Sequence, residues 1–392
     1  MMKSFAIVLV CYKRIDGVKR LLGSLEKVDF SGRNDIYLIF SIDNSGSSQM
    51  EDFANEYYWP YGEKIVRTFP QRQGLKNHIL QCGDYTEQFD IVCVLEDDIY
   101  VSNSMYHYAY QASEFYWDDD SIAGISLYSF QKNWLNWLVR FEPQRSVYDA
   151  YFLKVAQSWG QVWLRNKWSK FKEWYELNKV FTKSSNIPAY LQSWPESSWL
   201  KYHDRYLIET NRYFVYPYVS LTTNFSDAGE HAHFTVNDHQ VELQFGKELY
   251  SFPAFSDEAI RYDEYMNREG LERALGIPSE DLCVDFYNTN TAKRNRRYLL
   301  TLNHYNYKII NSYSLSLRPL ELSVIQDLQG DGIYLYDTSA KEDNKKFDGD
   351  FNRRLYSIRS HSSKEILRFA IKLRYIDVIT RLRGKINKII KK

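Results

Sequence analysis

The sequence is poor in several features that would place it in a structural class at once. Cysteine is rare and forms no C-x-x-C pair. Three of the four cysteines lie in or beside apolar segments, where reduced cysteine behaves as a small hydrophobic residue. We therefore expect a reducing compartment rather than a disulfide framework. The four are Cys11, Cys82, Cys93 and Cys283.

Long apolar runs and an excess of charge are also missing. No stretch approaches the roughly 20 apolar residues that a membrane-spanning helix needs, and residues 1–10 lack the pattern of a signal peptide. Lysine plus arginine number 50, as do aspartate plus glutamate, so no global field favours nucleic acid. We expect a cytoplasmic protein that does not bind nucleic acid.

A glycine-rich nucleotide loop is missing too. The first apolar run ends in Cys11-Tyr-Lys-Arg-Ile-Asp, which contains no glycine. A dinucleotide-dependent oxidoreductase would carry G-x-G-x-x-G at such a position. The same absence weighs against a sugar nucleotidyltransferase, which remains an alternative.

Aromatic residues, by contrast, are abundant: 33 tyrosines, 22 phenylalanines and 10 tryptophans. Some of these rings will form the core. Others suit sugar binding, because an aromatic face stacks on the C–H face of a pyranose. A non-catalytic carbohydrate-binding protein is therefore a second alternative to keep.

The first 130 residues alternate between apolar runs and segments with helical spacing. Continuous apolar runs at 5–11, 36–42 and 91–95 are typical of strands covered on both faces. Between them, residues such as 16–28 carry apolar side chains at helical intervals. This alternation predicts an α/β fold with a layered sheet. Further on, we expect a helix over 257–275 and strands at 307–311 and 332–336.

Polar clusters follow three of the predicted strands. They are the Tyr12-Lys-Arg14 turn, Asp43, and the acidic run Glu96-Asp97-Asp98. Ligands of such sheets bind at the carboxyl ends of the strands, so the clusters should converge. Carboxylates there suit Mn²⁺ or Mg²⁺ shared with substrate phosphates. The plainer interpretations are an acidic helix N-terminus for the run and turn chemistry for Asp43.

These motifs, in this order, resemble the GT-A glycosyltransferases. The similar stretches are residues 5–14, 43–45, 94–99, 158–168 and 216–225, and together they span roughly residues 4–233. Within the GT-A enzymes the sequence is most similar to the inverting type-2-like group and the N-acetylglucosaminyltransferase I group. The resemblance implies a Rossmann-like nucleotide-sugar-binding domain with a mixed central sheet.

The resemblance also implies roles for individual residues. Asp98 would be the direct metal ligand, and Asp97 or Glu96 would contact the ribose or the surroundings of the metal. Asp43 would hold the nucleoside. The remaining residues expected around the donor are Tyr12, Arg14, Arg72, Gly74 and Lys76.

Inversion needs a general base that takes the proton of the attacking acceptor hydroxyl. The family places an acidic residue beside a tryptophan at the start of a helix. Glu196, after Trp194-Pro195, fits that position, although the intervening proline and the longer spacing to Pro217 depart from the family pattern. Asp204, further along the same helix, is the rival candidate.

Two further features complete the expected site. The family often carries a Gly-x-His element after its Asn-Phe stretch, which makes His231 a candidate metal or phosphate ligand. Trp159 and Trp194 are candidates to frame an acceptor sugar.

We therefore expect a metal-dependent inverting glycosyltransferase. The donor would be a nucleotide-diphosphate sugar, UDP-linked by preference, and the acceptor a saccharide or a lipid-linked glycan, in bacterial surface polysaccharide or glycoconjugate synthesis. The expected domains are the GT-A domain at 1–234, an accessory α+β region at 235–350 that shapes the acceptor site or mediates homodimerisation, and a helical tail at 351–392.

The tail from residue 363 to 392 is strongly basic. It carries ten lysines and arginines against Glu365 and Asp377, with apolar residues at helical spacing. A basic amphipathic helix of this kind can lie on an anionic membrane surface, which would make the protein peripheral at the plasma membrane. It can equally pack on the body of the protein with a solvated basic face.

Overall fold

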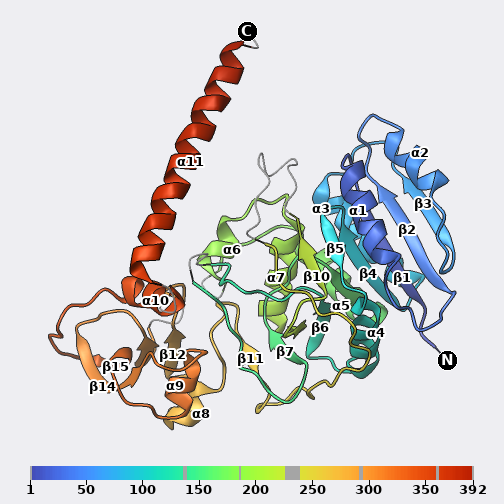
Figure 1. Ribbon diagram of the computed structural model, residues 1–392. Helices are drawn as coiled ribbons and strands as arrows, with labels where there is room; N and C mark the ends of the chain where they lie inside the picture. Colours follow the sequence, from blue (N-terminus) through green and yellow to red (C-terminus); the bar gives the residue numbers. More distant parts are fainter. Residues whose placement is uncertain are drawn as a thin grey trace.

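The computed structural model describes residues 2–135, 139–184, 187–225, 239–290, 295–358 and 362–390. A large twisted sheet with helices on its faces forms the main body, and a smaller unit follows it in the chain (Figure 1). The last helix extends away from this smaller unit.

The large sheet has nine strands in the order β11-β7-β9-β6-β8-β4-β1-β2-β3. From β4 to β3 all neighbours are parallel, whereas β8 runs antiparallel to both β4 and β6. The predicted α/β fold with a mixed central sheet is therefore confirmed. The strands are β1 (Phe5–Cys11), β2 (Ile36–Ile42), β3 (Lys64–Thr68), β4 (Ile91–Glu96), β6 (Ile122–Ser126), β7 (Ala150–Leu153), β8 (Gln161–Leu164), β9 (Tyr213–Pro217) and β11 (Arg261–Tyr262).

Helices cover the sheet and bury the apolar stripes that their spacing predicts. All seven residues of β1 are buried, as expected of a strand covered on both faces. In α1 the buried apolar side chains are Val18, Leu21, Leu22 and Leu25. The helices of this part are α1 (Ile15–Leu25), α2 (Gln49–Glu56), α3 (Leu75–Gly83), α4 (Met105–Phe115), α5 (Arg165–Leu177), α6 (Ala189–Ser193) and α7 (Trp199–Thr210), with the 3₁₀ turn η1 (Asp84–Glu87).

A short two-stranded ribbon ties a distant segment to the acidic run. Strand β5 (Ile99–Val101) pairs antiparallel with β10 (Thr222–Asn224), and Asn224 lies opposite Ile99. Beyond β10, the N–H of Phe225 donates to the carbonyl of Asp98 at 2.9 Å. The stretch after β9 therefore returns to the end of β4.

The smaller unit contains a four-stranded sheet in the order β12-β13-β15-β14. The strands predicted at 307–311 and 332–336 are confirmed. The elements are β12 (Leu282–Asp285), β13 (Tyr298–Thr301), β14 (Tyr307–Ser314), β15 (Gly332–Lys341), α8 (Leu271–Leu275), α9 (Glu321–Ile325) and α10 (Gly349–Ile358).

The helix predicted over 257–275 is wrong except for its last turn. Residues 261–262 form β11 at the edge of the large sheet instead. The side chain of Asp263 accepts the N–H groups of Tyr265 and Asn267, both at 2.9 Å, and this local turn competes with a helix. The chain after residue 235 thus rejoins the first sheet before it builds the second.

The tail is helical, as predicted, from Ser363 to Ile390 (α11). Several of its large apolar side chains are exposed, so its described part is not packed on the body of the protein. They include Leu367, Phe369, Ile371, Leu373, Tyr375 and Ile376. None of the described helices is long and apolar enough to cross a bilayer.

Candidate active site

The acidic run ends β4 and lies directly under Arg14, the residue before α1. One terminal nitrogen of Arg14 is 3.1 Å from Oδ2 of Asp98, and the other forms an ion pair with Asp97. The second oxygen of Asp98, Oδ1, is buried and has no hydrogen-bond partner among the described residues. Burial, and then the nearby carboxylates of Asp98 and Asp97, raise the pKa of Glu96 well above its usual range.

A glycine lets α1 approach this run closely. A Cβ atom at Gly17 would lie 2.4 Å from the carbonyl oxygen of Asp97, which is closer than any real side chain allows. The close approach holds Arg14 over the two carboxylates. The sequence analysis predicted no role for Gly17, although a glycine inside an amphipathic helix is a known sign of close backbone packing.

The acidic run fits a divalent cation. A buried carboxylate oxygen without a partner costs free energy unless something binds it. The guanidinium of Arg14 faces Oδ2 of Asp98, so Oδ1 is the oxygen that is left for a cation. Within the described ranges no three His, Cys, Asp or Glu side chains converge as a complete metal cage. Mg²⁺-type sites commonly use only one or two carboxylates and complete their shell with substrate phosphates and water. The candidate ligand His231 lies outside the described residues.

Asp43 ties the end of β2 to the loop before α3. Its buried carboxylate accepts N–H groups from Gln73 at 2.7 Å, from Gly74 at 3.0 Å and from Asn44 at 2.8 Å. Gly74 has a φ of +70°, which glycine adopts without strain. Asp43 therefore fixes the turn that precedes the first helical residue of α3.

The same turn carries Arg72 toward the end of β1. The Arg72 guanidinium lies 5.2 Å from the ring centre of Tyr12, within the range of a cation–π contact. The structure thus brings together Tyr12, Arg14, Asp43, Arg72, Gly74 and the acidic run at the carboxyl ends of β1, β2 and β4.

Lys76 and Glu196 meet although they are 120 residues apart. The ammonium of Lys76 is 3.0 Å from the backbone carbonyl of Glu196 and 4.2 Å from the ring centre of Tyr202. The Glu196 carboxylate accepts from Lys201 at 2.8 Å and from Tyr202 at 2.5 Å. These bonds, that of Lys201 first, lower the pKa of Glu196, so it is ionised at neutral pH. Its side chain is 62% exposed.

Asp204, the rival candidate base, is buried in the core. Its Oδ1 accepts the N–H of Ala156 at 2.6 Å, and its Oδ2 has no partner among the described residues. Burial raises the pKa of Asp204 well above the ordinary range, which disfavours the ionised form that a general base needs. Of the two candidates, only Glu196 presents an ionised carboxylate to solvent.

The two candidate acceptor tryptophans lie in separate aromatic clusters, and both are partly buried. The ring centre of Trp159 is 4.7 Å from that of Tyr128, and its backbone carbonyl accepts from Thr222 of β10 at 2.6 Å. Trp194 lies 5.1 Å from Trp134, ring centre to ring centre. Trp159 is thus connected to the acidic run through β10, and Trp194 adjoins Glu196.

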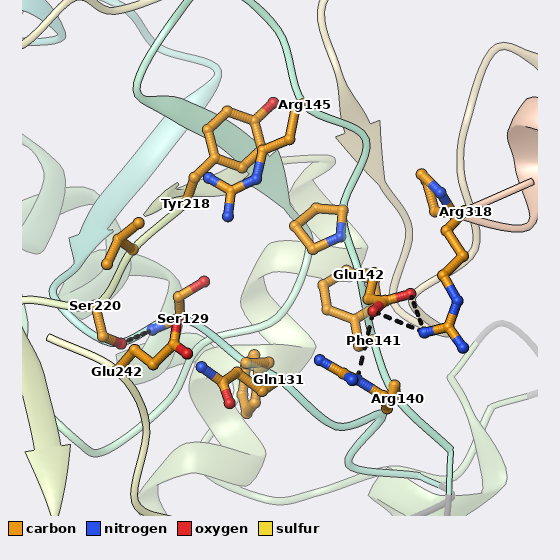
Figure 2. A pocket seen from close by; sticks show the side chains of 14 residues that line it. Ser129, Gln131, Arg140, Phe141, Glu142, Arg145, Tyr218, Ser220, Glu242 and Arg318 are labelled. Atoms are coloured by element: carbon orange, nitrogen blue, oxygen red, sulfur yellow. Dashed lines mark hydrogen bonds and ion pairs between the residues drawn. The ribbon is translucent and has the colours of Figure 1, made fainter. Parts of the chain in front are cut away.

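A cavity of 310 Å³ opens beside this edge of the sheet (Figure 2). The loops that follow β6 and β9 form most of its wall, and Arg318 of the smaller unit reaches into the same lining. The polar and charged side chains around it are those of Ser129, Gln131, Arg140, Glu142, Arg145, Tyr218, Ser220, Glu242 and Arg318. No sequence motif pointed to this cavity, because its walls come from four separate parts of the chain.

No protein-family model matches the chain, and no curated protein matches it in sequence. Glycosyltransferases are among the solved structures with a similar fold. The mannosyltransferase PcManGT from Pyrobaculum calidifontis, in complex with GDP-Man and Mn²⁺, is 10% identical with a TM-score of 0.34, over 56% of this chain and 58% of that one. GalNAc-T7 with UDP, GalNAc and Mn²⁺ is 10% identical with a TM-score of 0.38, over 57% and 43%.

Residues 1–349 of S. aureus TarS in complex with UDP-GlcNAc are 11% identical, with a TM-score of 0.34, over 66% of this chain and 63% of that one. The chain therefore covers less than two thirds of each of these structures. At such identities and TM-scores the matches carry no argument about activity, which has to be argued from the chain's own residues.

Proposed function

We propose that this chain is a glycosyltransferase that transfers a sugar from a nucleotide-diphosphate donor to a saccharide or lipid-linked acceptor, with inversion and with a divalent metal. The observation that carries the proposal is the state of Asp98. This carboxylate lies two residues after a buried parallel strand, has one buried oxygen without a partner among the described residues, and faces the guanidinium of Arg14. Such an arrangement suits a site for a cation and a diphosphate.

Each residue at this edge of the sheet has a part in the proposed reaction. Asp98 holds Mn²⁺ or Mg²⁺, which when bound neutralises the charge that develops on the departing diphosphate. Arg14 and Arg72 add positive charge beside the phosphates. The turn held by Asp43 forms the side of the pocket on which the nucleoside lies.

The proposed general base is Glu196. Since it is ionised at neutral pH, it can accept the proton of the acceptor hydroxyl as that oxygen attacks the anomeric carbon. The Lys201 and Tyr202 bonds use two of the roughly four lone-pair directions of the carboxylate. A lone-pair direction of the Glu196 carboxylate therefore remains for the hydroxyl group of the acceptor.

For the donor and acceptor, we propose a UDP-sugar and a growing surface glycan. The exposed apolar side chains of α11, together with its many lysines and arginines, suit contact with an anionic membrane surface that displays a lipid-linked acceptor.

A donor screen in Mn²⁺ that follows nucleoside diphosphate release tests this function. We expect one nucleotide sugar to be turned over, and EDTA and Asp98→Asn each to abolish release while the protein stays folded. Asp118→Asn, at an exposed position just after the C-terminal end of α4, is the matched control and should behave like the wild type. Release of pyrophosphate instead would indicate a nucleotidyltransferase. Sugar binding without any metal-dependent nucleotide binding would indicate a carbohydrate-binding protein.

A further inference from the structure

Hydrogen bonds fix the backbone of the wall segment that carries Arg145 into the cavity of Figure 2. The N–H of Gln144 donates to the hydroxyl of Tyr262 at 2.7 Å, and its carbonyl accepts from the hydroxyl of Tyr218, also at 2.7 Å. Tyr262 in turn donates to the buried carboxyl of Glu321. Tyr262 of β11 and Tyr218, which follows β9, therefore hold the backbone immediately before Arg145.

The smaller unit is also fixed against this wall. Glu142 accepts from Arg318 at 3.2 and 3.3 Å and lies 3.4 Å from Arg140. Arg318 additionally donates to the carbonyl of Tyr356 at 2.7 Å. Arg318 is thus a fixed part of the cavity wall rather than a free surface side chain.

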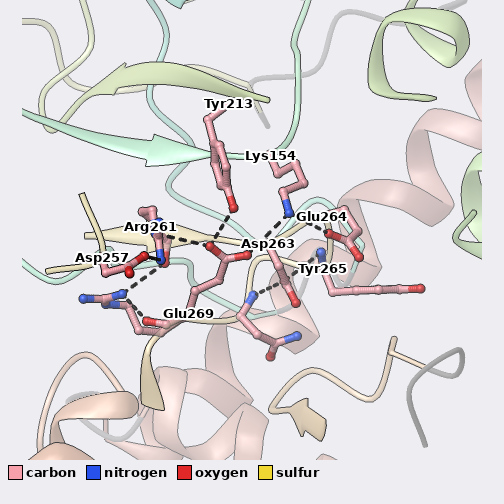
Figure 3. A network of polar contacts seen from close by, with 10 residues as sticks. Lys154, Tyr213, Asp257, Arg261, Asp263, Glu264, Tyr265 and Glu269 are labelled. Carbon is pink, nitrogen blue, oxygen red and sulfur yellow. Dashed lines mark hydrogen bonds and ion pairs between the residues drawn. The ribbon is translucent and has the colours of Figure 1, made fainter. Parts of the chain in front are cut away.

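A polar network fastens the connection between the two units at the sheet edge (Figure 3). Tyr213 of β9 donates to Glu269 at 2.8 Å, and Lys154, which follows β7, lies 3.5 Å from the same carboxylate. Arg261 of β11 is 3.5 Å from it as well. The segment that leads into the smaller unit is therefore bound to the large sheet, and the cavity that both units line has defined walls.

The charges of the cavity leave one cation unneutralised. Glu142 is shared by two arginines, whereas Arg145 lies 4.8 Å from the ring centre of Tyr218 and has no carboxylate within ion-pair distance among the described residues. In Figure 2 the guanidinium of Arg145 hangs toward the centre of the cavity, opposite Ser129. Glu242, the other acidic side chain, lies beside Ser129 at the far wall.

The cavity continues past Arg145, and one of its lining segments runs on in the chain to β10, beside the acidic run. A second cavity of 260 Å³ shares Arg145, Tyr218 and Val219 with the first. The carboxylate in that second lining, Asp149, is paired with Lys247 at 2.5 Å. On the other side, Ser220 precedes Asn224 by four residues, at most about 13 Å of chain at about 3.3 Å per residue, and Asn224 lies opposite Ile99, next to the acidic run.

We propose that these two adjoining cavities form a binding site for an acidic acceptor glycan, and that Arg145 recognises its phosphate or carboxylate group. A guanidinium that lines a cavity together with hydroxyl and amide side chains is well suited to bind either oxyanion. In this proposal the charged group binds one or more sugar units away from the acceptor hydroxyl that reacts. The inference rests on the proposed function, since it names the class of acceptor for the same reaction.

Calorimetry with the full chain and three defined oligomers tests the inference. The probes are trigalacturonic acid, which carries carboxylates, a three-unit glycerol phosphate oligomer, which carries phosphodiesters, and maltotriose, which is neutral. We expect at least one acidic probe to bind tenfold or more tighter than maltotriose. We expect Arg145→Gln to remove that difference and Glu242→Gln to increase it. Preference for one acidic probe identifies the anion as carboxylate or phosphate.

The control variant is Arg297→Gln, which changes an exposed arginine of the smaller unit that pairs with Asp337. It should bind the acidic probes like the wild type. Arg145 is preferred to Arg318 for the test, because Arg145 is exposed and its loss leaves the joint between the units intact. Equal affinity for acidic and neutral probes, no binding of either acidic probe, or unchanged binding by Arg145→Gln would overturn the inference.

Binding of UDP and GDP with Mn²⁺, measured on the same samples, separates the two proposals. Retained nucleotide binding with no acidic preference removes only the acceptor site. Loss of metal-dependent nucleotide binding in the wild type removes the proposed function itself.

Discussion

Arg14 holds both carboxylates of the acidic run at once, with one terminal nitrogen 3.1 Å from Asp98 and the other paired with Asp97. The two partners lie more than 80 residues further along the chain. In the structure without ligand, the guanidinium of Arg14 therefore supplies the positive charge beside these carboxylates. In the proposed reaction, a metal shared with the donor diphosphate supplies positive charge at the same place. Removal of the Arg14 charge should therefore change the affinity of the protein for a metal ion.

Arg14→Gln should tighten the binding of Mn²⁺ to the nucleotide-free protein by about tenfold or more. A unit charge at about 4 Å contributes a few kcal/mol at an effective dielectric constant near 20, so loss of this cation favours another. Electron paramagnetic resonance titration of free Mn²⁺ measures the change. Arg14→Lys keeps the charge and is the control. Binding by Arg14→Gln that is no tighter than in the wild type would contradict the competition.

Gly17→Ala should lower both stability and donor turnover. Its new methyl group would meet the Asp97 carbonyl at 2.4 Å, and overpacking of this kind costs about 1–3 kcal/mol. Gly23→Ala in the same helix meets nothing within 4 Å and should stabilise by about 0.5–1 kcal/mol. Urea unfolding of both variants tests the contrast. Equal effects at the two glycines would mean that α1 does not press on the acidic run.

Glu196→Gln should lower kcat by roughly 10²- to 10⁴-fold, the usual contribution of a general base, with little change in donor KM. Asp204→Asn should leave kcat nearly unchanged, because that carboxyl is buried away from the acceptor and burial raises its pKa well above the ordinary range. Since hydrogen bonds lower the pKa of Glu196, the acid limb of the wild-type rate profile should lie below the ordinary glutamate range. A large loss of kcat in Asp204→Asn, with none in Glu196→Gln, would make Asp204 the general base instead of Glu196.

Glu321→Gln should make stability less dependent on pH. Burial raises the pKa of Glu321 from 4.5 to about 7, so the folded protein binds this proton more tightly than the unfolded chain does. The free energy of unfolding is then highest below pH 4.5, falls as the pH rises, and reaches its lower value above pH 7. The glutamine variant should be more stable than the wild type at pH 8, as thermal unfolding between pH 5 and 8.5 would show. The same slope in both proteins would assign the pH dependence to other groups.

Removal of residues 363–392 should abolish binding to vesicles that contain anionic lipid and spare turnover with a water-soluble acceptor. The apolar side chains of the described part of α11 are exposed, and basic residues near an anionic surface contribute about 1 kcal/mol each. Co-sedimentation with vesicles of phosphatidylglycerol and phosphatidylcholine measures the effect, and pure phosphatidylcholine is the control. Undiminished binding after the truncation would place the membrane contact elsewhere.

The strands at the centre of the fold and the position of the acidic run were predictable because both depend on local pattern. A continuous apolar run such as 5–11 has few alternatives to a buried strand, and residues that follow parallel strands meet at one edge. Asp43 was predictable as part of that edge for the same reason. The helix over 257–275 failed because one side chain, Asp263, binds two nearby N–H groups and outweighs a helical pattern.

The sequence by itself determined which chemistry could gather at the edge of the sheet, through the strand pattern and the carboxylates after it. Only the tertiary structure decided which of those groups remain available. It placed Arg14 on Asp98, buried Asp204, and joined Arg318 to Glu142 across 176 residues. In the part of the chain that the structure describes, it also left one oxygen of the Asp98 carboxylate without a partner. Ionisation and pairing depend on burial and on neighbours brought from far along the chain, and a local pattern does not contain them.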